Sequence, residues 1–133
     1  MKNFLLAITL IFSVVLAPAC VQKGGEATDA DAGKTIKVGV YVDLSGATSS
    51  FGQSTKNGIE LAVEEINKAG GVLGKQLQLV IEDDQGRPEQ AKTVVQKLIS
   101  QDKVQVVLGE VASTNSLAAA PVAQEAKIPM ITP

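Results

Sequence analysis

Ser113 has the best local setting for binding chemistry, because it lies in a loop that leads into a predicted helix. The loop reads Gly109-Glu110-Val111-Ala112-Ser113-Thr114. The first backbone N–H groups of a helix lack intrahelical acceptors and carry partial positive charge, so they stabilise an anion such as a carboxylate. The Ser113 hydroxyl can add one hydrogen bond to that anion. A second interpretation stays open, because serine also caps helices well and one hydroxyl can serve both purposes.

Phe51 is the second candidate for a binding residue. It is one of only two aromatic residues after the N-terminal segment, the other being Tyr41. Phe51 follows a turn at Gly46 and lies in the first loop of the predicted fold. An aromatic ring there can form the apolar wall of a binding site. Packing of the ring against the edge of the sheet explains the pattern equally well.

Two other patterns suggest chemistry but do not fit it. The run Gly70-Gly71-Val72-Leu73-Gly74-Lys75 is similar to a phosphate-binding loop. However, it lacks the first glycine at the required spacing and the hydroxyl residue after Lys75, and it leads into a predicted strand. The run Glu82-Asp83-Asp84 could suggest Mg²⁺ or Ca²⁺, but no calcium-loop spacing follows it. We expect these acids to form a solvated loop, and we expect no metal site.

The composition excludes further classes of function. The 133 residues include no His and a single Cys. A His-dependent nucleophile, a His-ligated metal, a Cys-based zinc site and an internal disulfide are therefore excluded. The 12 Lys and Arg residues are balanced by 14 Asp and Glu residues, without the basic runs typical of nucleic-acid-binding proteins. We expect neither an enzyme nor a cofactor, and no nucleic acid partner.

Residues 1–19 are predicted to be a signal peptide. Lys2 precedes an apolar segment, 4–16, which is too short to span a bilayer comfortably. The small residues before Cys20 resemble the lipobox of bacterial lipoproteins, which implies diacylation of Cys20 and anchoring to a membrane. Ordinary cleavage that leaves a free thiol is the alternative. The polar residues 20–34 are then a flexible tether, or a tail without a role.

From residue 35 onward, segments with apolar residues at every second position alternate with segments at helical spacing. Short connections separate them. This order predicts an α/β fold with a parallel, doubly wound sheet. Such sheets bind ligands outside the carboxyl ends of their strands, where the loops after residues 42, 82 and 108 would meet. The predicted strands are 36–42, 76–82, 104–108 and 128–132, and the predicted helices surround 59–66, begin at 88 and span 113–126.

Three local features carry further expectations. Gly39 leaves one face of the first strand without bulk, which permits the close approach of a helix. The run Ala69-Gly70-Gly71 should end the first helix, because glycine accepts the left-handed conformation.

Residues 117–123 are apolar all round, so the third helix should be buried on more than one side. Pro121 should bend that helix or remove one of its hydrogen bonds.

Taken in order, these segments resemble type I periplasmic binding proteins of the leucine/isoleucine/valine-binding group. The resemblance extends from Ile36 to Pro133 without a gap, and the ordered set of segments is specific although no single one is. The segments that carry it are Ile36-Lys37-Val38-Gly39-Val40, Leu44-Ser45-Gly46, Phe51-Gly52-Gln53, Asn57-Gly58-Ile59-Glu60-Leu61-Ala62, Glu65-Ile66-Asn67-Lys68-Ala69-Gly70-Gly71-Val72-Leu73-Gly74, Glu82-Asp83-Asp84, Pro88-Glu89-Gln90-Ala91 and Ile128-Pro129-Met130-Ile131-Thr132-Pro133.

The resemblance implies an exported lipoprotein that binds branched-chain or other amino acids, or related small organic anions, between two lobes. It would deliver them to an ABC-type permease. Ser113 matches the serine whose hydroxyl and N–H hold the ligand carboxylate, Phe51 matches an aromatic that packs on the ligand, and Thr114 lies nearby. A ligand-binding sensor of the same fold is the alternative. Residues 35–133 would form part of the N-terminal lobe, with the second lobe beyond Pro133.

Overall fold

The computed structural model describes residues 33–133. The predicted signal peptide, Cys20 and all but the last two residues of the predicted tether lie outside the described residues. None of the described helices is long and apolar enough to cross a membrane. The elements alternate as β1 (Thr35–Val42), α1 (Ser49–Lys68), β2 (Gln76–Asp83), α2 (Pro88–Ser100), β3 (Val106–Leu108), α3 (Ser113–Glu125) and β4 (Met130–Ile131).

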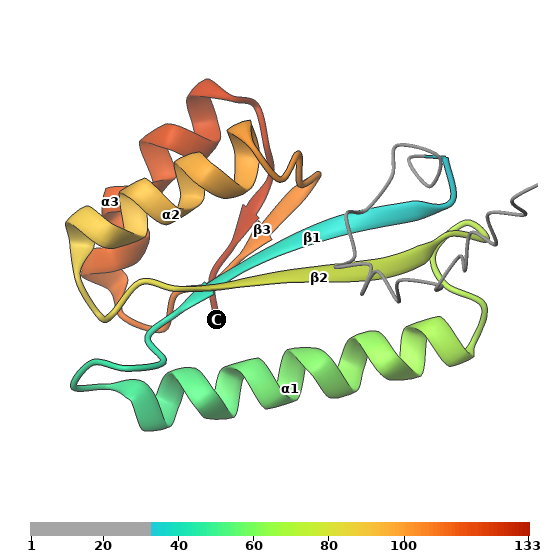
Figure 1. The fold of residues 1–133 in the computed structure, drawn as a ribbon, viewed down its shortest axis with the longest axis horizontal. Coiled ribbons are helices and arrows are strands. Elements are labelled where there is room, and N and C mark those ends of the chain that lie inside the picture. Colours follow the sequence, from blue (N-terminus) through green and yellow to red (C-terminus); the bar gives the residue numbers. More distant parts are fainter. Residues whose placement is uncertain (1–32) are drawn as a thin grey trace, which may run out of the picture.

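The described strands form one parallel sheet in the order β2-β1-β3-β4. β1 pairs with β2 over its whole length, from Thr35 opposite Gln76 to Val42 opposite Asp83. α1 covers one face of this sheet, while α2 and α3 cover the other (Figure 1). The prediction of a parallel, doubly wound α/β sheet is therefore confirmed, although β3 and β4 are shorter than expected.

Alternate residues of β1 supply two separate hydrophobic cores. Val38, Val40 and Val42 are buried on the face that α1 covers. Tyr41 is fully buried on the other face, among residues of α2 and α3. On that second face a Cβ at Gly39 would lie only 3.2 Å from a Leu98 methyl group, so the expected close approach of a helix is confirmed.

Glycines end α1 as predicted. The last helical residue is Lys68, and Gly70 follows with φ at +105°. The Gly71 N–H then donates to the Ile66 carbonyl at 2.9 Å, which satisfies an acceptor at the end of the helix. The helix begins at Ser49, well before its apolar stripe. Phe51 therefore lies in the first turn of α1, and its predicted place in the loop after β1 was wrong.

The prediction for α3 was wrong in one respect. This helix packs against α2 through Ala119, Val122 and Ala123, yet Leu117 is 74% exposed. When a helix is apolar all round, its sequence does not show which side will be buried. Within the described residues, α3 packs mainly against α2, through one of its sides. The helix runs on through Pro121, whose side chain is exposed.

Candidate ligand-binding site

Three loops meet at the carboxyl edge of the sheet, as the topology predicted. They comprise residues 43–48 after β1, 84–87 after β2 and 109–112 after β3. The Leu44 N–H donates to Asp83 Oδ1 at 2.9 Å, which joins the first loop to the end of β2. The Asp43 N–H donates to Glu110 Oε1 at 3.3 Å, which joins the first loop to the third.

Asp43 organises the first loop. Its Oδ1 accepts the Gly46 N–H, and its Oδ2 accepts both the N–H and the hydroxyl of Thr48, at 2.8 and 2.7 Å. Burial alone would raise the pKa of Asp43, but the hydrogen bonds from Thr48 and Gly46 outweigh it and hold the pKa below its ordinary value. Asp43 is therefore an ionised structural group that fixes the entry into α1.

The loops pack so closely that side chains are excluded at two glycines. A Cβ at Gly52 would lie 1.8 Å from the Asp43 carbonyl oxygen. A Cβ at Gly86 would lie 2.6 Å from Asp43 Oδ2, and Gly86 also has φ at +66°. These contacts hold the start of α1 and the β2–α2 loop directly against Asp43.

Glu110 shapes the third loop from inside. It is only 2% exposed, and its Oε2 accepts the Ala112 N–H while its Oε1 accepts the Asp43 N–H. The Glu110 carbonyl oxygen accepts the Ser116 hydroxyl at 2.8 Å. Glu110 thus clamps the loop that leads into α3 from both its side chain and its backbone.

The N-terminus of α3 presents free donors to solvent. Ser113 is the first helical residue, and the preceding Ala112 makes no side-chain cap. The N–H groups of Asn115 and Ser116 donate to the Ala112 carbonyl, whereas those of Ser113 and Thr114 have no acceptor within the described residues. Ser113 and Thr114 are both exposed. The interpretation of Ser113 as the helix cap is therefore wrong, and its hydroxyl remains available to a ligand.

Phe51 lies beside this helix end. It is 63% exposed, so it does not pack down on the edge of the sheet. Together with Thr48, Val111 and Ala112 it lines a hollow of about 200 Å³. The structure therefore brings Phe51 and the loop before Ser113 to one place. The sequence pattern did not predict Thr48 or Val111 as lining residues, although Val111 is an apolar residue in an otherwise polar loop and could have indicated this place.

The expectation that residues 82–84 form a solvated loop was wrong. Asp84 is fully buried, and Glu82 and Asp83 are half-buried. Asp84 Oδ1 accepts the Gly86 N–H at 2.9 Å, whereas its Oδ2 has no partner. Burial, together with the nearby carboxylates of Glu110, Asp43 and Asp83, raises the pKa of Asp84 to about 6 against the bond from Gly86. The convergence of three loops buries it, which local sequence cannot reveal.

Acidic residues do not form a metal site here. Within residues 33–133, no group of three or more His, Cys, Asp or Glu side chains is placed to hold a metal ion. The carboxylate oxygens of Asp43 and Asp83 instead accept hydrogen bonds from backbone N–H and hydroxyl groups of the loops.

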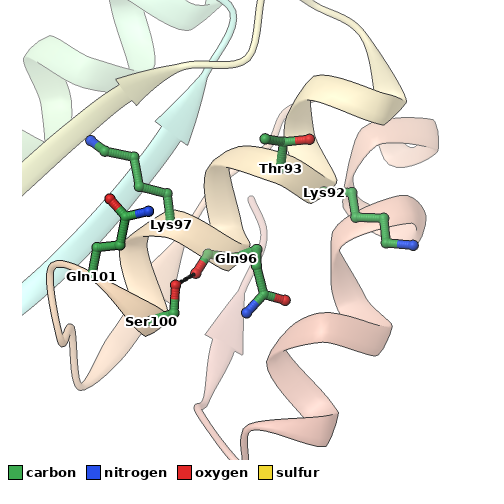
Figure 2. Close-up of a pocket in the computed structure, with 6 residues that line it drawn as sticks. All are labelled: Lys92, Thr93, Gln96, Lys97, Ser100 and Gln101. Atoms are coloured by element: carbon green, nitrogen blue, oxygen red, sulfur yellow. Dashed lines mark hydrogen bonds between the residues drawn. The ribbon is translucent and has the colours of Figure 1, made fainter.

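A second hollow lies along α2 and differs in character. It measures about 410 Å³ and is lined by residues of that helix and by Gln101, which directly follows it, as Figure 2 shows. Two of its polar groups already have partners within the protein, because the Ser100 hydroxyl donates to the Gln96 carbonyl at 2.6 Å and Lys97 pairs with Glu82. It lies away from the carboxyl edge, so it offers no converging loops for a ligand.

Comparison with known proteins decides the family. Residues 35–133 match the family described as periplasmic binding protein. The chain belongs to this family. Its relatives include a Leu/Ile/Val-binding protein of Rhizobium johnstonii, which is 33% identical over 96% of this chain and 31% of the relative. The leucine/isoleucine/valine-binding group that the sequence resembles is therefore the correct group.

Solved structures agree with this assignment. A branched-chain amino acid transporter substrate-binding protein from Streptococcus pneumoniae, in complex with isoleucine, is 38% identical to this periplasmic binding protein. The match has a TM-score of 0.73 and covers 74% of this chain and 28% of the other. A solute-binding protein of an ABC transporter from Rhodopseudomonas palustris, in complex with 3,4-dihydroxybenzoic acid, is 39% identical, with a TM-score of 0.67 over 74% of this chain and 26% of the other. The chain thus spans between 26% and 31% of the length of these relatives.

Proposed function

We propose that this protein is an exported solute-binding protein that captures a small carboxylate, with branched-chain amino acids as the first candidates, and delivers it to an ABC permease. The observation that carries this proposal is the open N-terminus of α3. There the N–H groups of Ser113 and Thr114 and the Ser113 hydroxyl are unoccupied, next to the apolar hollow at Phe51.

The chemistry of such a ligand follows from these two surfaces. A carboxylate accepts hydrogen bonds from the free N–H groups of a helix start and gains from the helix dipole. The apolar part of the ligand, next to its carboxylate, would contact Phe51 and Val111. These two side chains are 63% and 41% exposed, so they are accessible to a ligand. A ligand that combines one carboxylate with a compact apolar part fits this pair of surfaces best.

The ligands named with the solved relatives share that chemistry. Isoleucine joins a carboxylate to a branched aliphatic side chain, and 3,4-dihydroxybenzoic acid joins a carboxylate to a ring. A common carboxylate with a variable body supports a role for the α3 N-terminus in holding the carboxylate. In this proposal, residues outside 33–133 select among ligand bodies.

Substitution of Ser113 tests the proposal directly. We expect Ser113→Ala in the full-length protein to weaken binding of its amino acid or aromatic acid ligand about 10- to 100-fold, because a hydrogen bond to a charged group is lost. Isothermal titration against a panel of amino acids and hydroxybenzoates measures this. Ser100→Ala is the matched control, because Ser100 is an exposed helical serine on α2. Absence of binding by the wild type, or undiminished affinity in Ser113→Ala, would contradict the proposal.

We also propose that the mature protein is anchored to the membrane through lipid on Cys20. The sequence before Cys20 and the position of this only cysteine support the proposal. Mass spectrometry of the purified protein should find a diacylated N-terminal cysteine, and Cys20→Ser should release the protein into the soluble fraction. An unmodified thiol at Cys20 in membrane-free wild-type protein would argue for ordinary cleavage instead.

A further inference from the structure

Three buried acids lie in the loops that converge at the carboxyl edge, including the loop that leads into α3. Asp43 and Asp84 are fully buried and Glu110 is 2% exposed, and each belongs to a different loop of the carboxyl edge. Glu110 Oε2 accepts the N–H of Ala112, the residue that precedes α3. A ligand carboxylate at Ser113 and Thr114 would therefore approach a carboxylate that already faces the same helix end.

Asp84 is the one member of this group with an unsatisfied oxygen. Asp43 uses both oxygens on donors of its own loop, and Glu110 uses both on backbone N–H groups. Asp84 Oδ1 accepts the Gly86 N–H, but the buried Oδ2 has no partner. A buried carboxyl oxygen without a donor favours the protonated form, because burial penalises the charged one.

The charges around Asp84 act in the same direction. Glu110 faces it from the β3–α3 loop, Asp43 from the β1–α1 loop and Asp83 from the end of β2. On β1, the buried Tyr41 phenol is affected by Asp84 in turn. At the start of α2, Arg87 is exposed and donates to the side chain of Gln85. Each neighbouring carboxylate therefore favours a proton on Asp84.

We infer that Asp84 couples proton uptake to ligand binding at α3, so that the carboxylate binds more tightly when Asp84 is protonated. This inference rests on the proposed function. A carboxylate bound at the start of α3 adds negative charge beside Ala112, whose N–H donates to Glu110, and Glu110 in turn acts on Asp84. The added charge makes the protonated form of Asp84 more favourable still. By linkage, protonation of Asp84 must then raise the affinity for the carboxylate by the same factor.

The pH dependence of affinity tests this coupling. We expect the full-length protein to bind L-isoleucine, or 3,4-dihydroxybenzoate if that is its ligand, about two- to sixfold more tightly at pH ~5.5 than at pH ~7.5. That range corresponds to a ligand-induced rise of about half to one unit in the pKa of Asp84. The carboxylate of either probe stays ionised over this interval, so its own charge there does not change.

Two variants separate Asp84 from other acids. Asp84→Asn keeps an oxygen for the Gly86 N–H and places a neutral amide where Oδ2 had no partner. It should bind with little pH dependence, at an affinity close to that of the wild type at the lower pH. Glu89→Gln is the control, because Glu89 is an exposed acid in the first turn of α2, and it should keep the wild-type profile.

The outcomes distinguish the inference from the proposed function. Binding by the wild type with no pH dependence, or an unchanged slope in Asp84→Asn, would overturn the coupling and leave the proposed function standing. No binding at either pH would overturn both. If Asp84→Asn fails to fold, NMR titration of the Asp84 carboxyl in the wild type decides, since its midpoint should rise when the ligand is added and a fixed midpoint would refute the coupling.

Discussion

At the scale of single residues, the aspartates of the carboxyl edge divide into two kinds. Asp43 and Asp83 accept several hydrogen bonds, which hold the pKa of each below its ordinary value despite burial. Asp84 is buried with one free oxygen, and its pKa is raised to about 6. In their ionised form, Asp43 and Asp83 stabilise the loops that donate hydrogen bonds to them. Ionised Asp84 instead opposes folding, because its charge is buried without a donor for one oxygen.

Asp84 should therefore make the folded state less stable at neutral pH than in mild acid. Its pKa is higher in the folded state than in the unfolded chain, so its stabilising effect is fully present below the unfolded value. That effect is lost as the pH rises through about 6. We expect Asp84→Asn to remove this part of the pH dependence and to raise the free energy of unfolding at neutral pH by about 1–2 kcal/mol.

Denaturant melts without ligand, recorded between pH ~5 and pH ~8, measure this effect. The control is again Glu89→Gln. It should lose a little stability at every pH in this interval, because Glu89 carries charge in the first turn of α2, but its dependence on pH should follow that of the wild type. A wild type that gains stability steadily across this interval, or an Asp84→Asn variant that is less stable than the wild type at neutral pH, would contradict the assignment of Asp84.

At the scale of elements, sequence patterns predicted the strands and helices but not every buried side. Alternating valines identified β1, and two glycines identified the end of α1. The same patterns misplaced Leu117, which is exposed, because they do not show which side of a helix meets a partner. They also treated residues 82–84 as solvated, because the burial of Asp84 depends on loops far apart in the chain.

For the candidate site too, the sequence predicted the general place but not every residue. The rule for parallel sheets placed the β1–α1 and β3–α3 loops at one edge, and the structure confirms that these two loops meet there. Phe51 itself lies just inside α1, not in the loop where it was predicted. It did not indicate Thr48 or Val111, whose places depend on how tightly the loops pack. Nor did it indicate that Glu110 turns inward to accept two N–H groups.

α1 offers a matched test of how its first turn is held. A methyl group at Gly52 would collide with the Asp43 carbonyl oxygen, whereas one at Gly58 meets nothing within 4 Å. We expect Gly52→Ala to destabilise the protein by about 2–4 kcal/mol, as overpacking does, and Gly58→Ala to stabilise it by about 0.5–1 kcal/mol. Denaturant melts measure both. Equal effects of the two substitutions would show that the first turn of α1 moves freely away from Asp43.

At the scale of the whole molecule, the residues proposed to bind the ligand all lie at one edge of the sheet. α1 on one face and α2 with α3 on the other leave the carboxyl edge as the place where three loops converge (Figure 1). The hollow along α2 is larger than the one at Phe51, but it draws on a single helix (Figure 2). Convergence of separate loops, more than the size of a hollow, supports the proposal that the ligand binds at the carboxyl edge.

The central claim is that a ligand carboxylate binds at the N-terminus of α3. A crystal structure of the full-length protein grown with the ligand found by titration tests it most directly. We expect a carboxylate oxygen within hydrogen-bond distance of the Ser113 N–H and hydroxyl, with the apolar body of the ligand against Phe51. A ligand whose carboxylate lies away from α3, or one held only by residues outside 33–133, would contradict it.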